Sequence, residues 1–284
     1  MPSTQDLRRK IASVKATAKL TRAMQMVAAS KMSRAVQAAT ASRSYADTAW
    51  TVLGDLAVRT GATHPLFKER SVGKVALIVV ASNRGLAGSF NSQVFRAATT
   101  ALGDDVELIT VGRKALAYMR RFHGEQLIAD FPASDATPRT ADASPITQLV
   151  TDRFLRGEYR AVLVAYNKFE STLMQRPVVE QLLPVVPTTP DAETVATLAE
   201  FTIEPNLTEV LDALVRRVVP LRLYQMLLDS SASEHSARMV AMKSATDNAT
   251  DIVGDLTLTY QGVRQANITR EIIEVSSGAA ALAG

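Results

Sequence analysis

The distribution of helix-breaking residues constrains this chain more than any other feature of its sequence. Nine of its eleven prolines lie between residues 65 and 205, while none occurs from 3 to 64 or from 221 to 284. Glycine is also sparse in the two end segments. Because proline breaks helices and glycine weakens them, both ends can form long helices, and the middle must contain the turns. The sequence therefore predicts three parts with the bounds 1–64, 65–205 and 206–284.

The first part has the pattern of one long helix. Ser3 or Thr4 can cap its start, and Asp6 falls in the first turn, where a negative charge is favourable. Small and apolar residues then recur at alternating spacings of three and four, at Leu7, Ile11, Val14, Ala18, Thr21, Gln25, Ala28, Met32, Ala35, Ala39, Ser42, Ala46, Ala49, Leu53 and Leu56. That spacing is typical of a coiled-coil seam. Residues 23–29 are apolar on nearly every side, which predicts that this stretch is enclosed.

The last part has a second helical pattern that begins near residue 207. Pro220 lies inside it and predicts either a kink or two abutting helices. Beyond it, a second seam is expected at Met242, Ala245, Ala249, Ile252, Leu256, Thr259, Val263 and Ala266. The tail, SSGAAALAG, is small and uncharged and would fray in water, so we expect other polypeptide to shelter it.

The middle part alternates between strand and helix patterns. Runs rich in β-branched residues predict strands at 74–81, 106–111 and 160–166, a short strand at 126–129 and an edge strand at 178–186. Helices are expected after the loop at 82–91 and over 113–122 and 145–156. Such alternation predicts a parallel α/β sheet, inserted between the two long helices.

Composition excludes several functional classes. There is no cysteine, which rules out disulfides, thiolate metal sites and a cysteine nucleophile, and the three histidines are far apart in sequence. No apolar run approaches the length of a membrane span, and the first residues lack a signal-peptide core. We therefore expect a soluble protein that is made in a reducing compartment.

The loop SNRGLAGSFN, residues 82–91, is the strongest candidate for a phosphate-binding loop because it follows a buried strand. It contains two glycines, but it lacks a third at dinucleotide spacing and has no Gly-Lys-Ser/Thr. Neither Ser82 nor Ser89 lies in a G-x-S-x-G turn. We interpret the segment as a structural loop, and we expect no catalytic residue, cofactor or metal.

Charge is concentrated in the first helix. Residues 1–59 contain ten Lys and Arg against three Asp and Glu. This stripe could contact an acidic protein surface or nucleic acid, although only Tyr45 and Trp50 are aromatic before residue 60. Two alternatives to a purely mechanical role therefore remain open at this point. One is an α/β nucleotide-dependent enzyme with helical oligomerisation arms, and the other is a basic coiled-coil scaffold for nucleic acid.

Three sequence blocks resemble the γ subunit of F-type ATP synthases. They are IASVKATAKLTRAMQMVAASKM at 11–32, RMVAMKSATDNA at 238–249 and VRQANITREIIEVSSGAAAL at 263–282. The similarity extends to the central loop and covers essentially the whole chain. In that loop, Asn83 and Ala87 replace the Asp and Cys that are commoner in the family.

The resemblance implies a rotor shaft. The expected fold is a long antiparallel coiled coil of the two terminal helices with an inserted Rossmann-like parallel α/β domain. The implied partners are three α and three β subunits, the ε subunit and the membrane c-ring, and nucleic acid is not among them. The chain would be non-catalytic, would need no cofactor, and would be held by its partners at the cytoplasmic face of a bacterial inner membrane.

The resemblance also implies roles for residues near the C-terminus. Arg264 and Gln265 match positions that bond to a loop of the β subunit in the family. Thr269 and Glu271 follow within two turns and belong to the same coupling region. These assignments are carried over from the matching motif.

Further residues are assigned by the same comparison. Arg22 and Met24 match positions near the acidic lever of β, and Arg238 is expected to face the same zone. Glu204, together with Phe201, matches the base region that contacts the c subunits.

Overall fold

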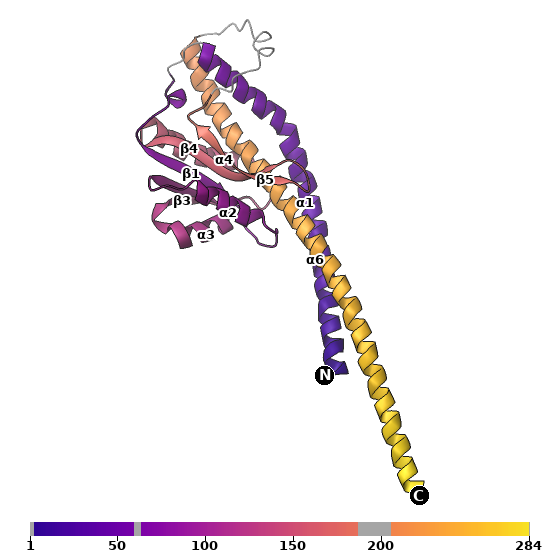
Figure 1. Ribbon diagram of the computed structural model, residues 1–284. Helices are drawn as coiled ribbons and strands as arrows, with labels where there is room; N and C mark the ends of the chain where they lie inside the picture. Colours follow the sequence, from indigo (N-terminus) through magenta and orange to yellow (C-terminus); the bar gives the residue numbers. More distant parts are fainter. Residues whose placement is uncertain (1–2, 60–63, 187–205, 284) are drawn as a thin grey trace. The chain divides into compact units, whose positions relative to one another are not determined.

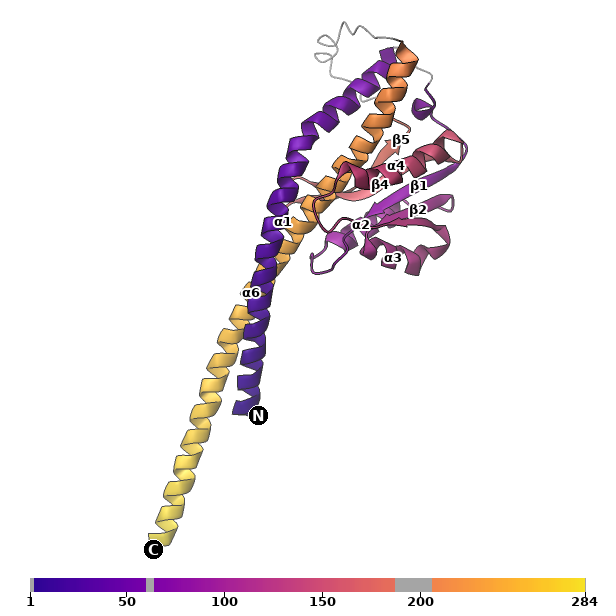
Figure 2. The same cartoon turned by 180° about the vertical axis from the view of Figure 1, so that it is seen from behind.

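Long helices form at both ends of the chain, as the proline distribution predicts. The computed structural model describes residues 3–59, 64–186 and 206–283. Helix α1 spans Thr4–Arg59 and helix α6 spans Leu207–Ala283 (Figures 1 and 2). Because α6 continues through Pro220 as one helix, the alternative of two abutting helices is wrong. At the start of α1, the Ser3 hydroxyl accepts a hydrogen bond from the backbone N–H of Asp6 at 3.1 Å, which is a helix cap.

Between these helices the chain forms a five-stranded sheet with the strand order β3-β2-β1-β4-β5. In chain order the elements are η1 Pro65–Phe67, β1 Lys74–Val80, α2 Phe90–Thr100, β2 Val106–Val111, α3 Arg113–His123, η2 Gly124–Gln126, β3 Leu127–Phe131, α4 Thr140–Leu155, β4 Tyr159–Phe169 and β5 Gln175–Leu183. Strands β1 to β4 are parallel, as predicted.

Two details differ from the sequence-based expectation. Strand β5 lies at the sheet edge but runs antiparallel to β4, because the short turn at Glu170–Met174 reverses the chain without a crossover helix. Helix α4 begins at Thr140 and not at Pro145, because the Asp142 carboxylate accepts a hydrogen bond from the backbone N–H of Arg139 at 2.8 Å and caps the extra turn.

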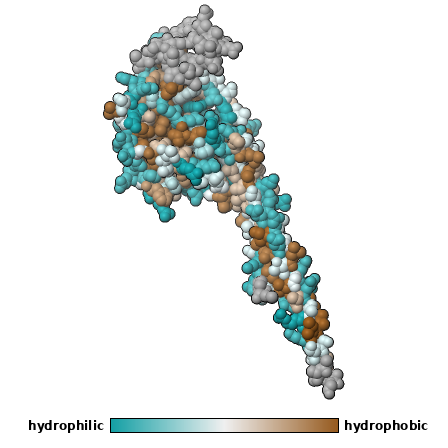
Figure 3. Space-filling view, viewed as in Figure 1, coloured by the Kyte–Doolittle hydropathy of each residue, from teal (hydrophilic) through white to brown (hydrophobic). Residues whose placement is uncertain are grey.

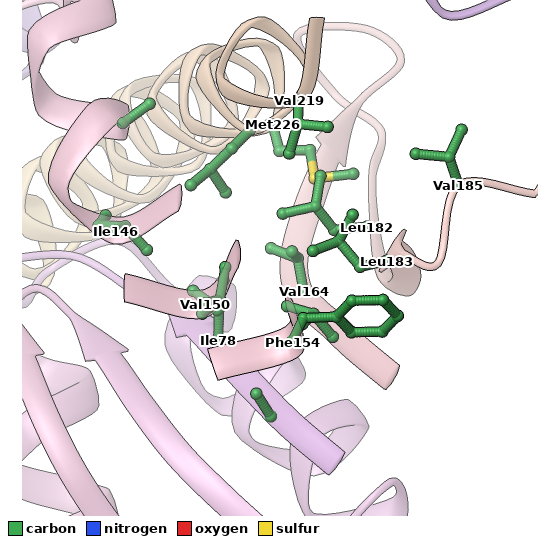
Figure 4. Close-up of a cluster of buried hydrophobic side chains, with 14 of the residues drawn as sticks. Ile78, Ile146, Val150, Phe154, Val164, Leu182, Leu183, Val185, Val219 and Met226 are labelled. Carbon is green, nitrogen blue, oxygen red and sulfur yellow. The ribbon is translucent and has the colours of Figure 1, made fainter. Parts of the chain in front are cut away.

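Each face of the sheet is covered by helices. On one face, α2 and α3 pack against alternate residues of β1 and β2, including Leu77 and Leu108. On the other face, α4 and parts of α1 and α6 enclose a larger core, with Ile78, Val150 and Met226 among its side chains (Figure 4). Strand β1 is buried at six consecutive positions, as expected for a central parallel strand.

The described chain divides into two compact units. The α/β unit comprises Ala28–Arg238, and the helical unit comprises Met1–Val27 with Met239–Gly284. Helices α1 and α6 each contribute to both units. Within the helical unit, side-chain hydrogen bonds join Thr21 to Thr246 and Arg8 to Tyr260. The residue nearer the start of α1 thus contacts the residue nearer the end of α6. The two helices are therefore antiparallel.

Candidate functional site

The paired helices of the helical unit contact each other along a narrow seam. On α1 the least exposed residues are those of the predicted stripe, with Leu7 only 3% exposed. The hydroxyls of Thr21 and Thr246 are 2.8 Å apart within this seam. Near the start of α1, the Arg8 guanidinium donates to the Tyr260 hydroxyl at 2.8 Å and lies 5.6 Å from the Tyr260 ring centroid.

The predicted seam on α6 is partly wrong. Met242 and Ala249 are buried as expected, but Ile252 is 48% exposed and Thr259 is also exposed. The inward positions are instead those one residue later, Val253 and Tyr260. A coiled-coil seam can alternate its spacings of three and four residues in either order. The sequence pattern alone therefore does not decide between these two sets of inward positions. Ala266, predicted as a further seam residue, is exposed, as are all residues from 264 to 279.

The segment of α6 from 264 to 279 carries four of the predicted coupling residues. Arg264, Gln265, Thr269 and Glu271 are all exposed there. Large aliphatic side chains in the same segment are equally uncovered, namely Ile268 at 43%, Ile272 at 62%, Ile273 at 58% and Val275 at 73% exposed. Figure 3 shows such hydrophobic residues among hydrophilic ones along the helical unit. Exposed aliphatic groups of this kind mark a binding surface.

The helical rotation of about 100° per residue sorts these residues onto two adjacent faces. Arg264 and Glu271, seven residues apart, share one face with Ile268. Gln265 and Thr269, four residues apart, share the other. Ile272 lies beside Gln265 on this second face, so each face combines polar groups that can hydrogen-bond with an aliphatic group that can be buried, and a partner can contact both.

The α1 half of the helical unit also exposes apolar groups. Leu20, Met26 and Val27 are 61%, 64% and 58% exposed. Among the predicted contact residues, Arg22 is exposed and Met24 is half-buried. This chain does not itself enclose the stretch that the sequence predicts to be surrounded, so its apolar side chains remain available to other polypeptides.

Arg238 lies in the α/β unit, where its side chain is 11% exposed. Its guanidinium donates to the Glu234 carboxylate at 2.7 Å and to the backbone carbonyls of Arg84 and Gly85 at 3.3 and 3.4 Å. The residue therefore fastens the loop after β1 to α6. Sequence reasoning missed this intrachain role, because no spacing pattern links residues so far apart. A contact with β stays a prediction.

Two ionisable neighbours of Arg238 have perturbed pKa values. Burial, with Arg238 and Lys31 nearby, lowers the pKa of His235 to about 4, so the ring is neutral at pH 7. Its Nδ1 lies 3.3 Å from the Arg238 guanidinium and accepts a hydrogen bond from it. Burial raises the pKa of Glu234, although its ion pair with Arg238 opposes this shift. Glu234, His235 and Arg238 therefore form a structural cluster in which the buried His235 ring is neutral.

The polar groups of the loop after β1 are occupied within the chain. The Ser82 hydroxyl donates to the backbone carbonyl of Arg84 at 2.6 Å, and the Ser82 backbone N–H donates to the Asn91 side-chain oxygen at 3.1 Å. The Asn83 amide donates to the Ala133 carbonyl and to the Asp135 carboxylate, both at 2.8 Å. The interpretation as a structural loop is therefore favoured over a phosphate cradle.

The carboxyl ends of the strands leave little space for a ligand. In doubly wound folds a nucleotide would bind at this edge. Here α6 covers it through Leu227, Ser230 and Glu234, and the remaining cavity beside Ala81 is about 30 Å³. That volume holds only about two or three water molecules, so a nucleotide does not fit.

A larger hollow of about 380 Å³ lies between η1, α4 and α6. Its polar groups include His64, whose Nε2 is 3.0 Å from the Asp212 carboxylate, and this hydrogen bond lowers the pKa of Asp212. Within residues 3–59, 64–186 and 206–283, no group of His, Asp and Glu side chains could hold a metal ion. In those same ranges no helix has the length and hydropathy needed to cross a membrane.

Comparisons with known proteins extend over the whole chain. A family profile described as ATP synthase matches residues 3–282. The ATP synthase gamma chain of Roseiflexus castenholzii is 46% identical over 292 aligned residues, covering 100% of this chain and 99% of that protein. The gamma chain of Pelotomaculum thermopropionicum is 42% identical over 286 residues, covering 99% and 100%.

Solved structures with the same fold come from rotary complexes. A chain of the Euglena gracilis mitochondrial ATP synthase, in a structure of OSCP, F1 and c-ring in rotational state 3, has a TM-score of 0.70 at 16% identity, covering 98% of this chain and 94% of that one. A chain from the central stalk and c-ring of the Tetrahymena thermophila enzyme has a TM-score of 0.61 at 23% identity, covering 80% and 99%.

Proposed function

This chain belongs to the family of ATP synthase gamma chains, and on that premise we propose that it is the rotating central stalk of a bacterial F-type ATP synthase. It transmits rotation between the membrane c-ring and a ring of three α and three β subunits. The observation that carries this proposal is the uncovered surface of α6 from 264 to 279, where aliphatic and polar side chains lie exposed together. A surrounding ring of subunits would cover a surface of this kind.

Coupling requires that the stalk interact differently with the three β subunits. A shaft of two unlike helices has no threefold symmetry, so each β subunit faces a different surface of it. A ligand shifts an equilibrium only by its differential affinity for the states, and the same holds for the stalk. Rotation then exchanges the nucleotide affinities of the three catalytic sites, so that ion flow drives ATP release and ATP hydrolysis drives the reverse.

Residue roles follow from the positions on α6. Arg264 and Gln265 contact a β loop from adjacent faces of the helix, and Thr269 and Glu271 extend the same contact. Arg264 is exposed and has no carboxylate partner within 4.0 Å among the described residues, so it is available to a partner.

The remaining predicted contacts complete the assignment. Arg22 and Met24 on α1, together with Arg238, contribute to the zone near the acidic lever of β. Glu204 and Phe201 contact the c subunits, and both lie outside the described residues. The ε subunit binds at the same base. The chain is peripheral and is held at the cytoplasmic face of the inner membrane by these partners.

The chain has no catalytic role of its own and binds no cofactor or nucleic acid. The cavity of about 30 Å³ at the carboxyl ends of the strands supports this proposal, because a nucleotide-dependent enzyme would need a site there. Calorimetry of the purified chain with ATP should give no binding heat, and the chain alone should hydrolyse no ATP. Binding of ATP in the micromolar range would contradict this part of the proposal.

The coupling role is tested by replacing Arg264 in the assembled complex. Arg264→Ala should lower ATP synthesis in reconstituted vesicles by about tenfold or more, because a charge-assisted hydrogen bond contributes roughly 1.5–3 kcal/mol and each 1.4 kcal/mol is about tenfold. The matched control is Arg270→Ala, which removes another exposed arginine that lies about 120° around the same helix from Arg264. Equal synthesis rates for the two variants would contradict the assignment.

A further inference from the structure

In the α/β unit, α1 and α6 approach each other through very small side chains. Ala28, Ala35, Ala39 and Ala46 of α1 are each at most 2% exposed. Alanine allows close helix contact, but it lacks the protruding side chain that fills a hole in a partner helix. A seam of this kind holds two helices together while resisting sliding or rolling only weakly. Something else must fix their register.

A polar cluster crosses this seam, and its Gln225 and Asp229 side chains are buried, whereas the Arg43 side chain is 37% exposed. The Arg43 guanidinium of α1 donates to the Asp229 carboxylate of α6 at 2.8 Å and to the backbone carbonyl of Phe169, at the end of β4, at 3.1 Å. Gln225 of α6 donates to the Ala39 carbonyl of α1 at 3.1 Å and to Asp229 at 3.2 Å. These bonds join α1, α6 and the sheet at a single point.

The cluster also includes a hydrogen bond from the Ser42 hydroxyl to the Gln225 side-chain oxygen, so both polar atoms of that amide are used. Gln225 is 3% exposed, and the Asp229 side chain is 4% exposed. The three bonds that cross from one helix to the other, Arg43 to Asp229, Ser42 to Gln225 and Gln225 to the Ala39 carbonyl, each depend on one relative position of the helices, because a shift of one residue along either helix would place the partner out of reach.

Stability does not explain this arrangement. Burial raises the pKa of the Asp229 carboxyl even though Arg43 lies beside it. The folded protein therefore keeps this carboxylate charged at a cost in free energy. Buried ion pairs are often replaceable by apolar side chains without loss of stability, and their best-attested contribution is to select one register. The cluster fits that role.

A second connection joins the same three elements one turn away. Arg222 of α6 donates to Asp47 of α1 at 2.8 Å and to Glu180 of β5 at 3.2 Å. Its guanidinium also lies 5.6 Å from the Trp50 ring centroid. The two connections lie on consecutive turns of α6, so together they resist rotation of the helices about the contact and not only sliding.

We propose that Arg43, Gln225 and Asp229 lock α1, α6 and the sheet in one register, so that torque applied to the α/β unit enters both helices without slip. We call these three residues the register lock. The proposal rests on the proposed rotor function, and it assigns to these residues a positioning role. The lock acts through the helices that carry the contact residues.

The test replaces the lock by apolar side chains of similar length, in the variant Arg43→Met/Gln225→Met/Asp229→Leu. The assembled complex should keep its melting temperature and its rate of ATP hydrolysis. The torsional stiffness of the rotor, measured from angular fluctuations of a probe on the α/β unit with the catalytic ring stalled, should fall. The angular variance should therefore rise above that of the wild type, because the Arg222 connection alone would then fix the helices against the sheet.

The control variant is Arg216→Met. It removes an ion pair that lies wholly within α6, to Asp212, and it should leave the variance unchanged. If the triple variant fails to assemble, Arg43→Lys decides the question, because it keeps the charge on a shorter side chain, whose nitrogen does not reach the position of Nη2 from which both bonds are donated. Its variance should exceed that of the wild type. A wild-type variance in either lock variant would overturn the lock, whereas failure of the wild-type chain to rotate would overturn the rotor function itself.

Discussion

The same two helices are used in opposite ways in the two units of the chain. In the α/β unit, α6 is buried at every position from Gln225 to Ser230, and polar bonds join it to α1 and the sheet. In the helical unit, the buried positions of α6 among the described residues end at Ala249, and aliphatic side chains lie exposed beyond it.

This difference shows that the α/β unit buries its apolar side chains within the chain itself, whereas the helical unit leaves many of its apolar side chains exposed. Helices of this length are stabilised mainly by burial of an apolar face and only slightly by intrinsic propensity. The α/β unit supplies that burial from its own sheet and helices. The helical unit supplies it along one seam only, so its remaining apolar surface depends on partners. The following predictions test this contrast.

Removing a leucine from α6 should have its largest effect in the α/β unit. Leu223→Ala creates a cavity in a fully buried site and should lower the free energy of unfolding by about 2–5 kcal/mol. Leu258→Ala makes the same change in the same helix, but this leucine is 69% exposed, so the loss should stay below about 0.5 kcal/mol. Urea unfolding of the purified chain measures both. Similar losses for the two variants would show that the helical unit has a core of its own.

We expect acid to affect the α/β unit through His235, because this unit buries the ring as a neutral group. Its pKa is lowered from 6.5 to about 4 by burial, with Arg238, Lys31 and Arg34 opposing its charge and Asp135 favouring it. Because the folded state binds this proton more weakly than the unfolded chain does, the contribution to stability is complete above pH 6.5. It is lost as the pH falls from 6.5 through about 4.

Replacing His235 should therefore flatten the pH dependence. One pKa unit corresponds to about 1.4 kcal/mol, so the ring accounts for roughly 3 kcal/mol of unfolding free energy between pH 6.5 and 4. His235→Gln should remove most of that slope, as measured by urea unfolding at a series of pH values. A variant that follows the wild-type slope would show that the buried ring does not control acid unfolding.

Much of this contrast could be predicted from the sequence, and the parts that could not share a physical reason. Breaker-free segments identified both long helices, and the strand at 106–111 was predicted to the residue, because composition and periodicity are local signals. The α6 seam was predicted with Ile252 where the structure has Val253, because two registers satisfy one pattern. Which register forms depends on the partner helix.

The polar contacts that join distant segments within the α/β unit were not predicted. Arg238 was assigned to a partner, and neither Arg43 nor Asp229 was singled out. Each of these side chains binds a group that is distant in sequence, and in several cases this group is a backbone carbonyl. Such contacts produce no recognisable spacing of residue types in the sequence. The contact residues at 264–271 could be proposed only through the family motif, because an exposed helix face looks the same whether or not a partner binds it.

Two glycines should respond to alanine with opposite signs. At Gly112, where φ is 95°, a Cβ atom would lie 2.2 Å from the carbonyl oxygen of Ala81, so Gly112→Ala should destabilise the α/β unit by more than the roughly 1–2 kcal/mol that a left-handed conformation costs. At Gly262, inside α6, an added Cβ atom would have no described atom within 4 Å apart from its chain neighbours and the local helix backbone, so alanine should stabilise the helix by about 0.5–1 kcal/mol. Thermal unfolding followed by circular dichroism distinguishes the two, and a loss at Gly262 would reveal an unrecognised close contact there.

The smallest effect concerns the pairing of α1 with α6 in the helical unit, where Arg8 contacts Tyr260 by a hydrogen bond and over its ring. Tyr260→Phe keeps the ring and removes only the hydroxyl, so we expect a loss of about 0.5 kcal/mol, while Arg8→Gln removes both contacts and should cost about 1 kcal/mol. Hydrogen exchange of the first turns of α1 reports this local opening.

Arg9→Gln is the control for that measurement, because the ion pair of Arg9 with Asp6 lies within α1 and does not cross the seam. If exchange at the start of α1 is faster in Arg8→Gln than in Arg9→Gln, the interhelical contact holds this end of the helix in place. Equal exchange in the two variants would mean that α1 opens here independently of α6, so that the helical unit would depend on its partners even for the pairing of its own two helices.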